Sequence, residues 1–481
     1  MHSTRFSSFA CACALLMAWG CSSTTGSPDD SGIPEGGAGA ASAAGQSSGT
    51  AGATASGAGG ALGAGAGGIV QSGAGTSGAA TAGGAGMGGS AGSGGASGSG
   101  TGGGAGGAPT GFAHPGVLVN KGMLEFVKTR IAQAPWKSAL STASNDSHGK
   151  LSYTATKTAT IACAPSSGPG SVGCNEEKSD ADAAYTHALI WYYTGNQANA
   201  AKAIEIMDLY SSTTKAHTLD NAQLQSAWVA PVFARAAEII RYSGAGWPED
   251  KAKQFGAMLT NAYLPYIKDF STRTGNWDAS TIEAVMAIAV YNDDKTNFDR
   301  AVARWRLRVP AWAYLSKTDG AQPVQPPGGN VSIGGYWINP TKYVDGLAQE
   351  TCKDQPGDGT GGMGHEQYGT AALINAAETA RIQGVDLFSE QKERLITTLE
   401  FHAKYLNNRG SVKQPTGLCA AGINDLTHDA MWEIAYNAYG NVLGQALPET
   451  QKLVMANRPT GLDHHMVWET LTHGDIGAAG L

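Results

Sequence analysis

Paired helical patterns separated by short turns recur along the chain from Met123 to near the C-terminus. In the first pair, apolar residues three or four positions apart share one helical face through Tyr192, residues 194–196 interrupt them, and the pattern resumes at Ala200. Four further pairs follow, and the last has its second helix after Pro448. The chain is therefore predicted to fold as a series of helical hairpins.

The loops between these pairs are long, aromatic and unequal in length, notably residues 316–349 and 407–424. Helical hairpins in series pack either as a solenoid or as an α/α toroid. Unequal loops favour the toroid, because they can build a cleft at one end of a ring. We therefore predict an all-α fold, an incomplete (α/α) toroid or barrel, over residues 111–481. Locally, a capping box of Ser179 and Asp182 predicts the start of the first hairpin, and short strands are expected around residues 331–337.

The N-terminal part of the chain has a different composition. Residues 22–110 are mostly Gly, Ala, Ser and Thr, which cannot bury enough apolar surface to fold, so a disordered linker is predicted there. Residues 1–21 combine Arg5, an apolar run and small residues, which indicates an export signal. The end of this segment, residues 18–21, resembles a bacterial lipoprotein cleavage site. The resemblance implies a lipid anchor on Cys21 and a periplasmic, outer-membrane or cell-surface location.

Seven cysteines occur in the chain, and four of them, Cys163, Cys174, Cys352 and Cys419, lie in the helical part. An even number in an exported domain favours disulfides over metal or nucleophile chemistry. Pairing Cys163 with Cys174 would close a short loop, and Cys352 with Cys419 would attach residues 343–369 to a later loop. Other pairings remain open.

The charge balance limits the classes of partner. A formal net charge of −7 argues against nucleic acid, although an acidic enzyme with a local basic cleft can bind an anionic polymer. His464, His465 and His473 lack the spacing of a known metal site, so no metal and no cofactor are expected. A monomer is expected.

Residues 343–369 concentrate ionisable and aromatic side chains just before a predicted helix. Glu350, Lys353 and Asp354 precede a Gly-rich segment, and His365 and Tyr368 follow it on one face of that helix. Histidine has the ordinary pKa of a base near neutral pH. The stretch therefore predicts an active site.

Several segments of this chain resemble the alginate lyase family. These are Asn276-Trp277 with the helix that follows, the order Glu350, Asp354 and His365 with Lys353 in place of the family arginine, and residues 432–437 and 469–473. Trp277 stands where the family has a histidine, and Gly364 stands where its polymannuronate-degrading branch has a tyrosine. The resemblance implies an α/α toroid that cleaves a uronate polymer by β-elimination.

That reaction needs a group to neutralise the C6 carboxylate, a base for the C5 proton and an acid for the C4 leaving oxygen. We predict Asn276, His365 and Tyr368 as the catalytic residues, with Tyr336 or Tyr343 as alternative phenols. The predicted substrate-binding residues are Arg273, Trp277, Tyr336, Trp337, Tyr343, Glu350, Lys353, Glu433 and His473.

Two other functions are compatible with the sequence. A glycoside hydrolase on the same fold would use paired carboxylates, such as Asp278 or Glu283 with Glu350. A carbohydrate-binding protein without activity is suggested by Trp277 and Gly364, which depart from the family pattern. An unsaturated product would distinguish a lyase from both.

Overall fold

The computed structural model describes residues 111–481, apart from 166–167, 274, 329–331, 339, 355–362, 409–416 and 421–431. The predicted export signal and linker, residues 1–110, lie outside the described residues. Among the helices that are described, none combines the length and apolar character needed to cross a bilayer.

Helices dominate the described residues, and the few strands are short. The α-helices are α1 Lys121–Lys128, α2 Trp136–Asn145, α3 Cys174–Thr194, α4 Gln197–Thr213, α5 Ala222–Tyr242, α6 Glu249–Met258, α7 Leu264–Ile267, α8 Asn276–Tyr291, α9 Lys295–Trp312, α10 Ser316–Asp319, α11 Ile333–Tyr336, α12 Gly364–Ile382, α13 Leu387–Glu390, α14 Lys392–Leu406, α15 Trp432–Tyr436, α16 Pro448–Asn457 and α17 Glu469–His473. The strands are β1 Thr160–Ala162 and β2 Ala216–Thr218, which pair in parallel, and β3 Leu462–Asp463 and β4 Met466–Val467, which pair antiparallel.

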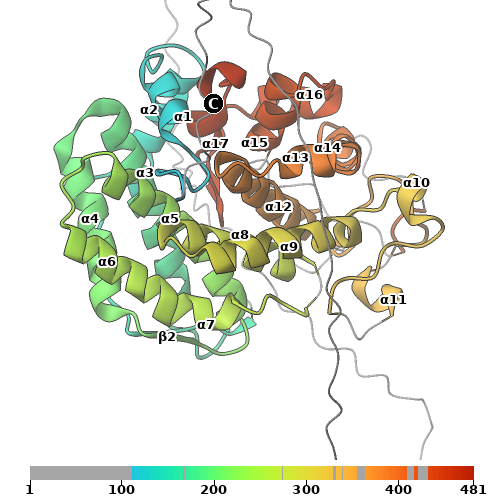
Figure 1. Ribbon diagram of the computed structural model, residues 1–481, viewed down its shortest axis with the longest axis horizontal. Helices are drawn as coiled ribbons and strands as arrows, with labels where there is room; N and C mark the ends of the chain where they lie inside the picture. The colour runs from blue at the N-terminus through green and yellow to red at the C-terminus, as the bar shows by residue number, and fades with distance from the viewer. Residues whose placement is uncertain are drawn as a thin grey trace, which may run out of the picture. The chain divides into compact units, whose positions relative to one another are not determined.

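The helices form the predicted serial hairpins, α3/α4, α5/α6, α8/α9, α12/α14 and α15/α16. Helices α3, α5, α8, α12 and α15 pack in that order as an inner layer, and α4, α6 and α9 pack outside it (Figure 1). Helix α17 contacts α15 on one side and α1 and α2 on the other, so the C-terminal and N-terminal elements meet. The prediction of an all-α toroid is confirmed.

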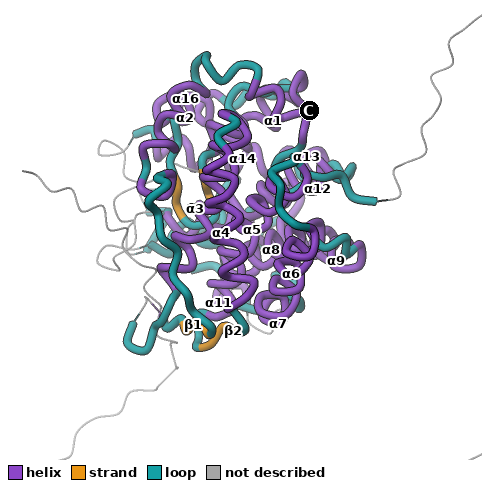
Figure 2. The backbone as a smooth tube through the Cα atoms, turned by 90° about the vertical axis from the view of Figure 1, so that its left-hand side faces the viewer, coloured by secondary structure: helices purple, strands orange, loops and turns teal. Residues whose placement is uncertain are grey.

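The inner helices are buried on almost every side. In α8, every residue except Trp277 is buried, and α12 is buried from Gly364 to Ala380. A helix that is apolar or small on all faces belongs in a core, because no side of it needs solvent. Figure 2 shows the same helices from the side, with β1 and β2 at the lower margin of the bundle.

Two local predictions were wrong. Helix α3 begins at Cys174, after Gly173 at φ 82°, so Ser179 lies inside the helix and forms no capping box. The disulfide at Cys174 and the left-handed glycine define this helix start instead. The strands expected around residues 331–337 are also absent from the described part of that segment, where Ile333–Tyr336 is a short helix.

Both disulfides pair as the first of the sequence alternatives, Cys163 with Cys174 and Cys352 with Cys419. The second bond attaches the segment between α11 and α12 to the segment after α14. Because alternate helices of a hairpin series run parallel, the inner helices all begin at one end of the ring. Residues 350–354 and the starts of α8 and α12 lie at that end, and the candidate site is built there.

Candidate active site

His365 and Asp354 form a buried pair at the start of α12. The Asp354 carboxylate accepts the His365 backbone N–H at 2.9 Å and a second hydrogen bond from Nδ1 of the imidazole. Burial opposes ionisation of Asp354, but the charge and hydrogen bonds of His365, together with the charge of Lys353, hold the carboxyl pKa below its usual value. Asp354 therefore stays ionised and fixes the ring orientation.

Tyr368 lies one helical turn after His365, and their ring centroids are 6.2 Å apart. The Tyr368 hydroxyl donates to Oδ2 of Asp463 at 3.4 Å. The ring of His464 packs against Tyr368 with 4.5 Å between centroids, and against Trp228 of α5 with 4.4 Å. The site thus combines α12 with residues from α5 and from the β3–β4 turn.

Asn276, Glu350 and Lys353 form a second polar group at the start of α8. The fully buried Glu350 carboxylate accepts the Asn276 backbone N–H at 2.6 Å, its side-chain amide at 3.1 Å and the Lys353 ammonium at 3.1 Å. Gly275, at φ 73°, makes room for this carboxylate, since a Cβ there would lie 1.8 Å from its Cδ. The Asn276 amide is thus engaged by Glu350, and Lys353 adds positive charge beside His365.

The predicted sugar-stacking residues fall into two aromatic groups. The Arg273 guanidinium lies 4.2 Å above the Trp277 ring, and both side chains keep exposed surface at the start of α8. Tyr336 and Trp337 are buried, and the Trp337 ring contacts Tyr343 at 5.5 Å between centroids. Arg273 and Trp277 therefore present surface to a ligand, whereas Tyr336 and Trp337 mainly pack the loop before α12.

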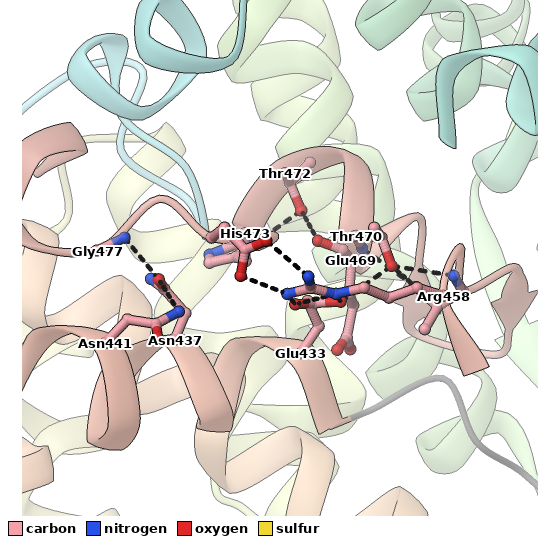
Figure 3. Close-up of polar contacts among 11 residues, drawn as sticks. Glu433, Asn437, Asn441, Arg458, Glu469, Thr470, Thr472, His473 and Gly477 are labelled. Carbon is pink, nitrogen blue, oxygen red and sulfur yellow. Dashed lines mark hydrogen bonds and ion pairs between the residues drawn. The ribbon is translucent and has the colours of Figure 1, made fainter. Parts of the chain in front are cut away.

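Glu433 and His473 belong to a separate buried network, which Figure 3 shows. Glu433 accepts hydrogen bonds from Arg458 Nε at 3.0 Å and from the Thr470 hydroxyl at 3.0 Å. The His473 ring contacts the Thr472 hydroxyl at 2.8 Å and Glu378 at 3.4 Å. These contacts join α12, α15 and α17. Glu433 and His473 therefore hold helices together in this structure.

The carboxylates of the hydrolase alternative are all buried and bonded. Asp278 accepts from Arg304 Nε at 3.1 Å, and Glu283 is paired with Arg235. Burial raises the pKa of Glu283 to about 7 despite Arg235 and Asn375. Glu350 is held as described above. All three carboxylates are thus buried and bonded to neighbouring side chains.

Sequence reasoning missed Asp463 as a site residue and considered His464 only as a metal ligand. Within the described part of the chain, no group of three or more His, Cys, Asp or Glu side chains is arranged to hold a metal ion. No sequence signal marks the β3–β4 turn, because Leu462-Asp463 is not an apolar pair and His464-His465 is not a favoured hairpin loop. The sequence could not show that this turn meets α12.

Comparison with known proteins gives a family match over part of the chain and a shared fold. A family model described as "Alginate lyase" matches residues 136–325, and no curated protein matches the chain. A crystal structure of an alginate lyase from Bacteroides ovatus has 13% identity and a TM-score of 0.51, covering 75% of this chain and 99% of that one. Alginate lyase A1-III from Sphingomonas species A1 has 14% identity and a TM-score of 0.52, covering 76% and 97%. A variant of A1-III in complex with a tetrasaccharide has 13% identity and a TM-score of 0.53, covering 76% and 96%.

At these identities, the solved structures show the shared toroid fold, while the family model matches the hairpins from α2 to the loop after α10. The two findings point in the same direction. Residues 136–325 match the alginate lyase family model, and the helices share the fold of solved alginate lyases, which supports a polysaccharide lyase.

Proposed function

We propose that this lyase cleaves alginate or a related uronate polymer by β-elimination, with His365 as the base and Tyr368 as the acid. The observation that carries the proposal is the placement of an Asp354-bound imidazole and a phenol one helical turn apart, at the end of the ring where the inner helices begin. The tetrasaccharide complex of A1-III supports an oligosaccharide ligand for this fold.

His365 has the arrangement of an oriented base. Because Asp354 accepts the hydrogen on Nδ1, Nε2 is the ring nitrogen that carries the lone pair and can take the C5 proton. The ionised carboxylate also stabilises the imidazolium that forms. Asp354 therefore supports His365 both in orientation and in charge.

Tyr368 is suited to the acid role. Its hydroxyl donates a hydrogen bond to the Asp463 carboxylate, so a phenol proton is present at the site for transfer to the leaving oxygen. In the elimination, the C5 proton moves to His365, a C4=C5 double bond forms, and the C4–O bond breaks. The leaving oxygen takes the phenol proton. The proton on the imidazolium then returns to the phenolate through solvent, which restores both side chains.

The substrate carboxylate needs positive potential. Lys353 at Glu350 and the exposed Arg273 at Trp277 supply two cations near the starts of α8 and α12. Helix N-termini add partial positive charge at the same end of the ring. Asn276 acts in this scheme by holding Glu350 and, through it, Lys353.

We also propose that the enzyme works outside the cytoplasm as a monomer, attached to a membrane through lipidated Cys21. The two disulfides support export, since such bonds persist in oxidising compartments.

The test is incubation of the protein with polymannuronate, polyguluronate, glucuronan and a neutral glucan, while following the ultraviolet absorbance of the unsaturated product. We expect a rise on a uronate polymer, and losses of about 100-fold or more for His365→Ala and Tyr368→Phe. Tyr242→Phe, at the C-terminal end of α5, removes a phenol at the opposite end of the ring and serves as the matched control.

Tyr336→Phe and Tyr343→Phe test the two alternative phenols. Full activity in Tyr368→Phe with loss in either of them would reassign the acid. Reducing ends without ultraviolet absorbance would indicate a hydrolase, and binding without any product would indicate a carbohydrate-binding protein.

A further inference from the structure

Three consecutive residues, the last of β3 and the two of the β3–β4 turn, each contact a different part of Tyr368. The Asp463 carboxylate accepts from the Tyr368 hydroxyl at 3.4 Å, and the His464 ring packs on the Tyr368 ring at 4.5 Å. His465 Nε2 donates to the Tyr368 backbone carbonyl at 3.1 Å, because a carbonyl oxygen can only accept. Residues 463–465 thus contact the hydroxyl, the ring and the main chain of Tyr368.

The backbone of the turn indicates that the side chain of His464 is needed. Residues 464 and 465 connect β3 to β4 as a two-residue turn, with Asp463 opposite Met466. Such turns favour Gly or Asn at a position with positive φ. His464 has φ 50°, a left-handed conformation that is uncommon outside glycine, although Asn, Asp and His adopt it more often than other residues. Surrounding contacts must hold a non-glycine residue in this conformation, which points to a role for the His464 side chain.

His464 is wedged between two aromatic rings. Its centroid lies 4.4 Å from Trp228 and 4.5 Å from Tyr368, while Trp228 and Tyr368 are 5.8 Å apart. Nδ1 of His464 is bonded to Asp463 Oδ1, and the Tyr368 hydroxyl contacts the other oxygen of that carboxylate. The Asp463 carboxylate therefore links the His464 ring to the Tyr368 phenol.

The turn is anchored to the inner helices rather than to the surface. Arg235 of α5 donates to the His465 carbonyl at 2.7 Å and is paired with Glu283 of α8, which also accepts from Asn375 of α12 at 3.1 Å. Burial, with the charges of Arg235 and His464, lowers the pKa of His465 to about 3, so its ring is neutral and remains a single-proton donor. The turn is consequently fixed relative to α12.

We propose that residues Asp463, His464 and His465 form a clamp that positions the Tyr368 phenol for proton transfer to the leaving oxygen. The inference rests on the proposed function of Tyr368. The clamp residues act through Tyr368, so they are positioning residues. Removing the clamp should slow the chemical step and leave substrate affinity nearly unchanged, because misplacing an acid by about 1 Å costs on the order of 100-fold in rate.

The main test is His464→Gly in the full-length protein, with kcat, KM and thermal midpoint measured on the uronate polymer that the wild type cleaves best. Glycine suits the positive φ, so we expect an unchanged or higher midpoint, a 10- to 100-fold lower kcat and a KM within about twofold. Asp293→Gly is the matched control, because Asp293 also has positive φ (56°) but lies in the turn after α8, where it contacts His114. It should leave kcat unchanged.

A second arm shows that the effect passes through Tyr368. In a Tyr368→Phe background, adding His464→Gly should change the residual rate by less than about threefold, since the positioned phenol is already gone. Asp463→Asn, which keeps an acceptor oxygen, should retain more activity than Asp463→Ala. If His464→Gly does not fold, His464→Asn, which tolerates the same φ, replaces it.

The outcomes separate the two proposals. A wild type that forms no unsaturated product on any uronate overturns the proposed function. A wild type that is active and sensitive to Tyr368→Phe, together with a folded His464→Gly variant whose kcat stays within about threefold, overturns the clamp alone. An equal loss in the Tyr368→Phe background also overturns it.

Discussion

Glu366, next to His365, illustrates how burial controls single ionisable groups in this ring. It is fully buried, with Oε1 accepting from the Thr370 hydroxyl at 2.5 Å. Burial raises its pKa to about 8, and Asp354 and Glu350 add to the rise. Burial also lowers the pKa of His402 to about 4. Both groups are therefore mainly neutral at pH 7, and their 3.6 Å contact is not an ion pair.

The predicted consequence is that the free energy of unfolding depends on pH, and that Glu366→Gln weakens this dependence. The folded pKa of about 8 lies above the ordinary value of 4.5, so the folded state binds the extra proton, and stability falls as pH rises from about 4.5 to 8. Glutamine keeps the Thr370 hydrogen bond without titrating. We expect the variant to be more stable at pH 8 by roughly 1–3 kcal/mol, with little difference at pH 4.5, in urea unfolding at both pH values.

Glu378→Gln is the control of opposite sign. Burial opposes ionisation of Glu378, but Arg381 and His473 outweigh it and lower its pKa to about 2. Its contribution is present above pH 4.5 and lost as pH falls toward 2, so glutamine there should destabilise the protein at pH 7. If Glu366→Gln lowers the free energy of unfolding at pH 8, Glu366 is ionised in the folded protein, and its assignment as a protonated carboxyl is wrong.

At the scale of elements, helix α12 is set against α9 through a glycine. Trp312 of α9 is fully buried, and its indole N–H donates to the Thr370 hydroxyl at 3.0 Å. A Cβ at Gly369 would lie 2.3 to 2.9 Å from three carbons of the Trp312 ring. The absence of a side chain at Gly369 therefore fixes how closely the helix that carries His365 and Tyr368 approaches its neighbour.

Gly369→Ala should destabilise the protein, although alanine favours helix by about 1 kcal/mol over glycine. The clash forces a shift of α12 or of the Trp312 ring, which costs about 1–3 kcal/mol. Urea unfolding measures the change, and Gly334→Ala in α11, where a Cβ would meet no atom within 4 Å, is the control. A Gly369→Ala variant as stable as the wild type would mean that α12 or the Trp312 ring can shift without loss of stability.

At the scale of the whole molecule, the disulfides join segments that the helices alone do not hold together. Cys352–Cys419 spans 67 residues and lies next to Lys353 and Asp354, whereas Cys163–Cys174 spans 11 residues at the start of α3. In the chain-entropy view, the longer loop gives more stabilisation. The longer disulfide also supports the segment that carries the catalytic pair.

We expect the double variant Cys352→Ser/Cys419→Ser to lose about 4 kcal/mol of stability and to show a reduced kcat. Cys163→Ser/Cys174→Ser should lose about 3 kcal/mol, with a smaller effect on kcat. Urea unfolding and initial rates on a uronate polymer measure both. Equal kcat values in the two variants would show that the longer disulfide does not support the site.

The sequence by itself determined the features that arise within a few turns of chain. Apolar periodicity specified the hairpins, and the three-residue spacing of His365 and Tyr368 placed them on one face of one helix. These features follow from local backbone geometry, which neighbouring residues decide.

Only the tertiary structure decided what the closed ring brings together. Tyr368 and Asp463 are 95 positions apart, and they meet because the β3–β4 turn is anchored to α5 and α8. Glu433 and His473 lie in family-like segments, yet closure of the ring buries them in a network with Arg458 and Glu378. No local pattern encodes such contacts, because they depend on how packed helices position side chains that are distant in sequence. For this reason the helices could be predicted from the sequence, whereas the contacts of the site could not.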